Sequence, residues 1–355
     1  MNRFMWSCFV LCVTVTPVGK ASAATAYEIH NLGNLPHLSA TYANAMNNVG
    51  QVVGEANGAL GRHAFLWDAA QGIRDLGTLG GTGSSALGIN DLGQVVGYAY
   101  TANDSEPHRF LWDAIDGMQD MGRGSARGIN NEGEIIEWSC VWDSAGIKIE
   151  LGTLPGYTYQ TCANAINNNA QVVGLCSKSG GGLHAFIWDR VNGMQDLSLI
   201  MGLGGVDAVA TDINDMGQVV GYARFPGSSD YHAFLWDRTS GVQDLGTLGL
   251  YSYATGINRN GEVVGYTYVR IGTGFVDRAF VWDDVNGMRD LGTLGGNWGH
   301  ASAINDSGHV VGFSLSNFGT FTAALWTPIP EPSTILALLC GLGGLGAFAR
   351  RRRRH

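Results

Sequence analysis

Seven copies of one sequence pattern constrain the fold of this chain more than any other feature. Each copy joins an Ile-Asn-x-x-Gly-like turn, a Val-Val-Gly-like strand and an apolar strand that ends in tryptophan. Successive tryptophans are 44 to 48 residues apart, except for one gap of 30; they are Trp67, Trp112, Trp142, Trp188, Trp236, Trp282 and Trp326. A repeat of this length cannot bury its apolar face alone, so the copies must stack on one another.

The second copy predicts four short strands. They cover residues 85–89, 94–98, 109–112 and 118–121, and the Asn90–Gly93 segment has the composition of a tight turn. The third copy is about 15 residues shorter, and the loss falls in the connection before its Trp142 strand. In the fourth copy Ala170 stands where glycine is expected, so we predict that Asn169 takes the left-handed position instead. Four short strands repeated radially are typical of a propeller blade.

The two ends of the repeat region complement each other. Residues 27–33 align with residues 72–77, a fourth strand without its first three, and the last copy stops after Trp326. The N-terminal strand can therefore complete the last blade. We predict an all-β, seven-bladed β-propeller of four-stranded blades, closed by that strand. A β-solenoid is the alternative, but it has no use for a displaced terminal strand.

The N-terminus has the features of a secretory signal peptide. Arg3 precedes the apolar run 4–15, and Ala21-Ser22-Ala23 is a small-residue cleavage site. The sequence therefore predicts a signal peptide over 1–23 and a seven-repeat propeller over 24–327. A sorting tail follows over 328–355.

The tail combines three elements in a fixed order. Pro330-Glu331-Pro332 precedes an apolar run, residues 334–349, and then five arginines, residues 350–354. The order of motif, span and basic cluster resembles the PEP-CTERM sorting signals on secreted proteins of Gram-negative bacteria. That resemblance implies processing by an exosortase, transient membrane anchorage through the span, and delivery to the cell surface or extracellular matrix. An ordinary tail anchor is the alternative.

Charge and cysteine content limit the partners. Without both terminal segments the chain has 14 basic and 29 acidic residues, a net charge of about −15, which argues against nucleic-acid binding. Cys162 and Cys176 flank the Asn167 turn symmetrically, seven residues either side of Asn169, and we predict a disulfide between them. Cys140 is predicted to be a buried free thiol.

Two further motifs recur in the repeats. His-Ala-Phe segments start at His63, His184 and His232, and Asp-Leu-Gly-Thr-Leu-Gly segments start at Asp75, Asp244 and Asp290. These motifs resemble the HAF family of extracellular repeats, which implies secretion and a repeat fold. Because equivalent positions in separate blades stand far apart, we interpret the histidines as strand caps and predict no metal site, cofactor or catalytic residue.

Loop asymmetry is the best sequence signal for a binding site. The turns from the first to the second strand and from the third to the fourth are short and uniform, whereas the other connections vary and carry aromatic residues. We call the face that carries the variable connections the loop face. Aromatic rings there suit sugars or protein partners, although local packing between blades is the alternative. The predicted ligand-binding residues are Tyr157, Tyr159, Tyr251, Tyr253, Trp298, Trp138 and Glu137.

These observations predict a non-catalytic protein that binds exopolysaccharide or another envelope component. Two alternatives remain open. One is a polysaccharide-modifying enzyme, a glycosidase or lyase, that uses Glu137 and neighbouring loop carboxylates. The other is a structural matrix protein that assembles with itself.

Overall fold

The computed structural model describes residues 26–329, apart from residues 60, 158, 180 and 204–206. The predicted signal peptide and the sorting tail, with Pro330, Glu331 and Pro332, lie outside the described residues. Residues 26–329 form a compact unit of strands with one short helix in the described part, α1 (Leu197–Ile200). The chain is therefore all-β, as the sequence predicts.

The strands follow the repeats, and we number the resulting units one to seven. The first four units contain β2 (Ala40–Met46), β3 (Val52–Gly58), β4 (Gly61–Asp68), β5 (Gly72–Gly77); β6 (Gly80–Ile89), β7 (Val95–Thr101), β8 (His108–Asp113), β9 (Gly117–Arg123); β10 (Gly128–Ile129), β11 (Ile135–Ile136), β12 (Cys140–Trp142), β13 (Lys148–Glu150); β14 (Gln160–Ile166), β15 (Val172–Ser177), β16 (Leu183–Asp189) and β17 (Gly193–Asp196).

The last three units contain β18 (Ala208–Ile213), β19 (Val219–Arg224), β20 (Tyr231–Asp237), β21 (Gly241–Asp244); β22 (Ser252–Ile257), β23 (Val263–Ile271), β24 (Gly274–Asp283), β25 (Gly287–Asp290); β26 (Gly295–Ile304), β27 (Val310–Ser316), β28 (Phe321–Pro328) and β1 (Tyr27–Asn31).

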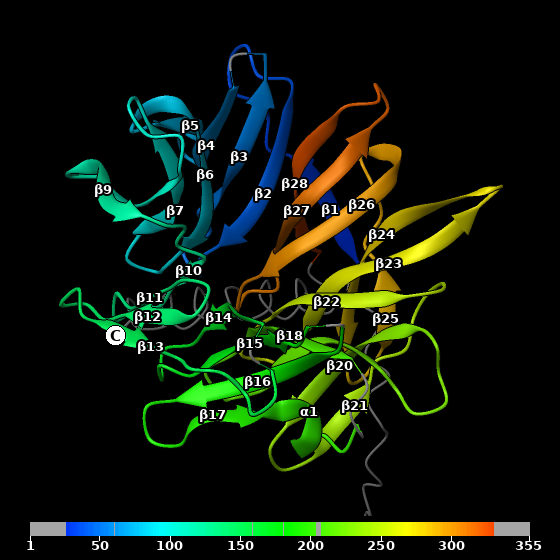
Figure 1. Cartoon of the computed structure of the whole chain (residues 1–355). Helices are drawn as coiled ribbons and strands as arrows, with labels where there is room; N and C mark the ends of the chain where they lie inside the picture. The colour runs from blue at the N-terminus through cyan, green and yellow to red at the C-terminus, as the bar shows by residue number, and fades with distance from the viewer. Residues whose placement is uncertain (1–25, 60, 158, 180, 204–206, 330–355) are drawn as a thin grey trace, which may run out of the picture. The chain divides into compact units, whose positions relative to one another are not determined.

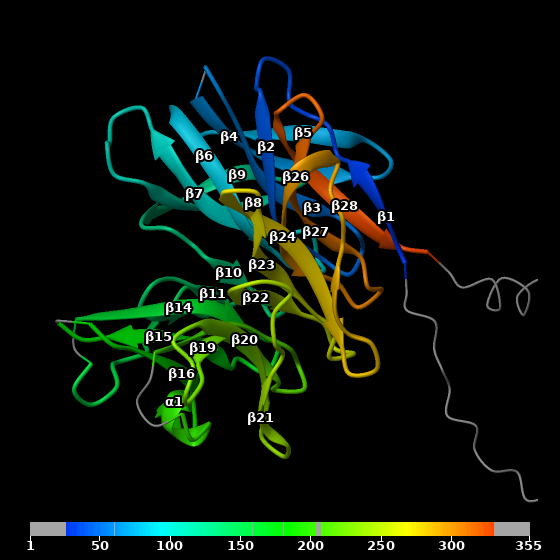
Figure 2. The ribbon, with the colours of Figure 1, turned by 90° about the vertical axis from the view of Figure 1, so that its right-hand side faces the viewer.

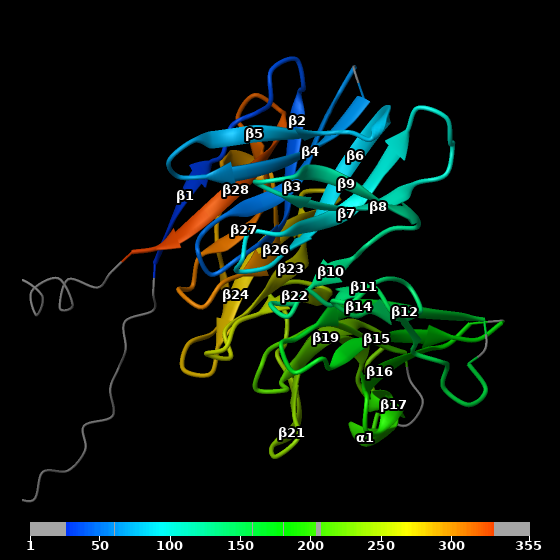
Figure 3. The same cartoon turned by 90° about the vertical axis from the view of Figure 1, so that its left-hand side faces the viewer.

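Antiparallel pairing within units one to six follows chain order, as in the green strands β14 to β17 of Figure 1. In the described part of the chain, units three to seven are separate four-stranded sheets. Units one and two count as one eight-stranded sheet because Arg62 and Gly83 form a single parallel pair between β4 and β6 (Figure 3). Four-stranded sheets are thus the building block of this fold.

The N-terminal strand joins the last unit. β1 lies antiparallel to β28, with Ile29 opposite Trp326 and Tyr27 opposite Pro328 (Figure 2). The four-stranded sheet β1-β28-β27-β26 is therefore built from both ends of the described chain. This is the pairing that the sequence alignment of residues 27–33 predicts.

The turn asparagines link each unit to the next. Asn47 accepts the backbone N–H of Gln51 at 2.8 Å, and its amide donates to the carbonyl of Asn90 in unit two at 3.0 Å. Equivalent bonds run from each following asparagine to the next unit, and Asn305 donates to the carbonyl of Asn47 at 3.4 Å. The asparagine side chain accepts a hydrogen bond within its own turn and donates one to the backbone of the next unit, which explains why asparagine recurs at this position.

The core lies between neighbouring units. In five units the phenylalanine two residues before the tryptophan is fully buried and packs with valines of the Val-Val-Gly segments; these residues are Phe65, Phe110, Phe186, Phe234 and Phe280. Full burial of such a side chain contributes about 1.5–3 kcal/mol. The contacts between units therefore stabilise the fold through burial of these side chains.

Two local predictions are wrong. Cys162 and Cys176 are free thiols, because a bulge between Ala163 and Ala165 shifts the register, so that Thr161 lies opposite Cys176 and Cys162 opposite Leu175. The two sulfurs thus belong to opposite faces of the sheet. Ala170 itself has a φ of 57°, so the left-handed position is not transferred to Asn169. Cys140 is buried and free.

Candidate functional site

Unit three departs from the repeat at Glu137. In the other six units this position, the last of the Val-Val-Gly segment, is glycine. A Cβ on Gly97 would lie 2.0 Å from the carbonyl oxygen of Ser85 on the first strand of its unit. In unit three the first strand is only Gly128–Ile129, and a Cβ on Gly124 would meet Glu137 Oε1 at 2.1 Å. The glutamate therefore fills space that the first strand occupies elsewhere.

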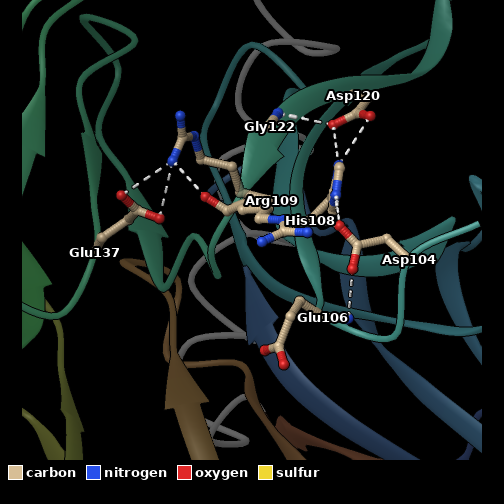
Figure 4. A network of polar contacts seen from close by, with 8 residues as sticks. Asp104, Glu106, His108, Arg109, Asp120, Gly122 and Glu137 are labelled. Carbon is tan, nitrogen blue, oxygen red and sulfur yellow. Dashed lines mark hydrogen bonds and ion pairs between the residues drawn. The ribbon is translucent and has the colours of Figure 1, made fainter.

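Arg109 of unit two is the partner of Glu137 (Figure 4). Its Nη1 lies 3.2 Å from both carboxylate oxygens, and its guanidinium lies 4.1 Å from the centre of the Trp142 ring. Trp142 Nε1 donates to Glu137 Oε2 at 2.7 Å. The Arg109 and Glu137 side chains are only 13% and 12% exposed. Both oxygens are thus occupied, and Glu137 lies beneath the surface rather than on it.

Arg109 also breaks the repeat, because five other units have alanine at this position. Two departures in neighbouring units have therefore produced a buried ion pair. Burial first, and then the Glu137 charge, raise the pKa of the Cys140 thiol to about 12, so this thiol stays protonated at neutral pH. The group is suited to joining units two and three.

The histidines of the His-Ala-Phe segments pair with the aspartates of the Asp-Leu-Gly segments. His108 Nδ1 lies 2.9 Å from both carboxylate oxygens of Asp120, and its Nε2 lies 3.2 Å from Asp104 Oδ2 (Figure 4). Three more pairs share this spacing of 12 residues, and in unit six arginine replaces histidine; they are His63–Asp75, His184–Asp196, His232–Asp244 and Arg278–Asp290. These residues join the third and fourth strands, and the constant spacing was a sequence signal that could have revealed them.

The contacts of His108 with Asp120 and Asp104 also affect the charge states of the loop before β8. Hydrogen bonds to Asp120 and then to Asp104 raise the pKa of His108. Hydrogen bonds lower the pKa of Asp104 to about 2; the largest contribution comes from the backbone N–H of Glu106, and the next from His108. Arg123 Nε donates to the same Asp104 oxygen at 2.7 Å. Because its carboxylate stays charged at neutral pH, Asp104 holds this loop against β8 and β9.

Trp138 and Tyr159 are the predicted ligand-binding residues that face solvent. Trp138 is 46% exposed, at the position held by Tyr98 in unit two and Tyr266 in unit six. The guanidinium of Arg127 lies 4.6 Å from the centre of the Trp138 ring. The backbone carbonyl of Trp138 accepts the N–H of Ala163 at 2.8 Å. Tyr159, before β14, is 73% exposed.

Tyr157, two residues before Tyr159 in the chain, is half-buried. Its ring centre is 4.3 Å from that of His184 and 5.4 Å from Lys178 Nζ. We call the group formed by Arg127, Trp138, Tyr157, Tyr159 and Lys178 the notch. It lies where the shortened unit three meets unit four.

The remaining predicted residues pack against other aromatic side chains. Tyr253 lies 4.7 Å from Tyr222 and 5.1 Å from Tyr266, between ring centres. Burial, and then the neighbouring tyrosines, raise the pKa of Tyr253 to about 12. Tyr251 contacts Tyr268 at 6.1 Å, and Trp298 contacts Phe321 at 6.5 Å. All three are half-buried, so this part of the prediction placed packing residues among the ligand-binding candidates.

Other polar features do not converge on a site. A central cavity of about 210 Å³ is lined by the Ile-Asn segments of the turns. Asp212 replaces a glycine or alanine of the other units and accepts the N–H groups of Ile213 and Ile257, both at 2.9 Å. Its burial outweighs these bonds and raises its pKa to about 7. In the part of the chain that the structure describes, no cluster of three or more His, Cys, Asp or Glu residues is placed to hold a metal ion.

Two family models match parts of the chain, one at its C-terminal tail and one in its middle. The model of the PEP-CTERM protein-sorting motif matches residues 328–354, which include Pro330, Glu331 and Pro332. This chain carries a PEP-CTERM sorting signal. The signal marks an exosortase-sorted, secreted protein of the Gram-negative cell envelope or surface. None of the helices within the described ranges is long and apolar enough to cross a membrane.

Residues 82–245 match a family described as "Protein of unknown function (DUF3466)". None of the curated proteins matches the chain. The resemblance to HAF repeats stays a prediction.

Solved structures resemble this one in fold at low sequence identity. Oligogalacturonate lyase from Vibrio parahaemolyticus has a TM-score of 0.58 and 11% identity, over 86% of this chain and 98% of its own. A puromycin hydrolase mutant has a TM-score of 0.52 and 13% identity, over 81% and 51%. The Aleuria aurantia lectin, titled a six-bladed β-propeller, has a TM-score of only 0.37 and 11% identity, over 84% and 98%, which is too weak for any inference. These similarities show only that the fold is all-β and has propeller-like structural neighbours.

Proposed function

We propose that the exported protein binds exopolysaccharide, without catalysis, at the cell surface or in the extracellular matrix. The observation that carries this proposal is the exposed tryptophan of the notch, with Arg127 stacked on it and the exposed Tyr159 on the neighbouring unit. Flat apolar faces with polar neighbours suit sugar rings. The sorting signal supports the location.

We further infer that the seven units form a seven-bladed propeller closed by β1. Two contacts support closure: the register between β1 and β28, and the hydrogen bond from Asn305 of unit seven to Asn47 of unit one. A closed ring leaves few strand edges and holds its loops rigidly, which lowers the entropic cost of binding. The shortened unit three, with Glu137 in place of glycine, would then interrupt the regular pattern of that ring.

The surroundings of Glu137 favour binding over catalysis. Its carboxylate already accepts hydrogen bonds from Arg109 and Trp142 and is almost fully buried. A general acid or base must reach the reacting atoms of a substrate. The enzyme alternative would need other carboxylates of the loop face, and one of these, Asp104, is held by His108 and Arg123.

The test is retention of the full-length chain, in mild detergent, on exopolysaccharide from the producing organism. We expect Trp138→Ala and Tyr159→Ala to reduce retention at least tenfold, since loss of a stacked ring removes about 1.4 kcal/mol or more. Phe318→Ala is the matched control, because Phe318 is an exposed aromatic residue of unit seven.

The polymer is recovered and sized afterwards. Intact polymer agrees with a binding role, whereas shortened polymer would replace the proposal by the enzyme alternative. Equal retention of all variants would place binding outside the notch, and no retention of the unmodified chain would contradict the proposal altogether.

A further inference from the structure

We propose that the glycan held at the notch is acidic, a polymer that carries carboxylate groups. This inference rests on the proposed function and names the chemistry of its ligand. It follows from two cations in the notch, Arg127 and Lys178, which have no carboxylate within 4 Å among the described residues. Five other arginines around the loop face do have one: Arg62 with Glu55, Arg109 with Glu137, Arg123 with Asp104, Arg224 with Asp207 and Arg278 with Asp290. Arg270, at the end of β23, bonds the carbonyl of Gly272 but lies over no aromatic ring among the described residues.

Aromatic rings hold both cations in place without neutralising them. Arg127 stacks on Trp138, and Lys178 lies over Tyr157. Arg127 Nη2 also donates to the side-chain oxygen of Asn164 at 3.3 Å, a neutral partner. A cation stacked on a ring keeps its full charge, and a planar guanidinium can meet a carboxylate with two parallel hydrogen bonds. The notch therefore presents fixed positive charge beside flat rings.

The carboxylates near the notch are already engaged. Glu137 is paired with Arg109, and Asp196 with His184 at 2.7 Å. Asp207 accepts from Leu183 N–H at 2.9 Å and pairs with Arg224. The notch thus presents two cations that none of these carboxylates pairs with, in a chain that is otherwise acidic. At short range local charge decides binding, because salt screens charges beyond about 8 Å.

The spacing suits a polymer rather than a single sugar. Trp138 is fixed to β14 at Ala163, whereas Tyr159 is fixed beside Lys178 through its N–H bond to the carbonyl of Ser177 at 3.1 Å. Four residues of extended chain separate Ala163 from Tyr159, about 13 Å at ~3.3 Å per residue. Two rings and two cations spread over this length can contact several successive sugar units.

The experiment compares alginate, a polymer of uronic acids, with carboxyl-reduced alginate, its neutral counterpart, using the full-length chain. We expect at least tenfold tighter binding of alginate. Arg127→Gln and Lys178→Gln should each weaken alginate binding about tenfold and leave binding of the reduced polymer unchanged. Arg127→Lys, which keeps the charge, should recover part of the loss. Arg123→Gln is the control, because Arg123 is exposed and already paired with Asp104.

The outcomes separate this inference from the proposed function. Equal affinity for both polymers, with no effect of either substitution, would overturn the acidic ligand while leaving the binding role intact. No binding of either polymer, together with retention on exopolysaccharide of the producing organism, would overturn the acidic ligand alone. Loss of that retention as well would overturn both. Unfolding midpoints show whether the Arg127→Gln variant is folded. If it is not, the Lys178→Gln variant provides the test, because Lys178 is exposed on its loop.

Discussion

Glu137 and Arg109 allow a quantitative test of the buried ion pair between units two and three. Glu137→Gln keeps the shape of the side chain and an acceptor for Trp142, but it leaves the Arg109 charge buried without a counter-charge. At 3.2 Å and an effective dielectric constant near 20, the direct attraction is about 5 kcal/mol, and the desolvation of both groups offsets part of it. We expect each single variant, Glu137→Gln and Arg109→Gln, to lower the free energy of unfolding by about 3–5 kcal/mol.

The double variant isolates the pair. With both charges gone, no unpaired ion remains in the protein, so the double variant should lose at least about 2 kcal/mol less than the sum of the single variants. The assay is equilibrium unfolding in urea, followed by tryptophan fluorescence and by circular dichroism, and coincidence of the two signals checks that unfolding is two-state. A coupling energy below about 0.5 kcal/mol, or a harmless Glu137→Gln, would refute the structural role of Glu137.

Three further predictions concern local features. The folded-state pKa of Asp212, about 7, exceeds the unfolded value near 3.9, so its stabilising contribution is full below about pH 4 and is lost as the pH rises to 7. Asp212→Asn should therefore match the unmodified chain at pH 4 and be about 2–4 kcal/mol more stable at pH 8, as urea midpoints at both values would show; equal midpoints at pH 8 would contradict this. Ala170→Gly should stabilise by about 0.5–1 kcal/mol, because glycine, unlike alanine, takes a φ of 57° without strain; a destabilised variant would speak against that backbone conformation. Alkylation of the unfolded, unreduced chain should label both Cys162 and Cys176, whereas unlabelled peptides would restore the predicted disulfide.

Much of the fold could be predicted from the sequence because its signals are local. The Asn-x-x-Gly turns, the alternating strands and the alignment of residues 27–33 with residues 72–77 each depend on a few neighbouring residues. They led to the strand order within units and to the pairing of β1 with β28. The disulfide failed because a bulge adds one residue to a strand, and nothing in the Ala163-Asn164-Ala165 segment marks it.

The candidate site was predicted only in part, since exposure depends on how units face each other. Tyr253 and Trp298 resemble Trp138 and Tyr159 in their sequence positions. Yet Tyr253 packs against Tyr222 of the neighbouring unit and Trp298 against Phe321 of its own unit, whereas Trp138 and Tyr159 reach solvent. One signal was available and missed. Aligning residues 134–138 with residues 94–98 places Glu137 on the glycine of the Val-Val-Gly segment, which already indicates that unit three differs there.

The most direct test of the account follows the tryptophan indole N–H signals by NMR. The chain, labelled with ¹⁵N-tryptophan in detergent, is titrated with exopolysaccharide oligomers, and Trp138→Phe identifies the Trp138 signal. We predict that this signal shifts and saturates with the oligomer, while the indole signal of buried Trp326 stays in place. A Trp138 signal that does not move while other signals shift would contradict binding at the notch.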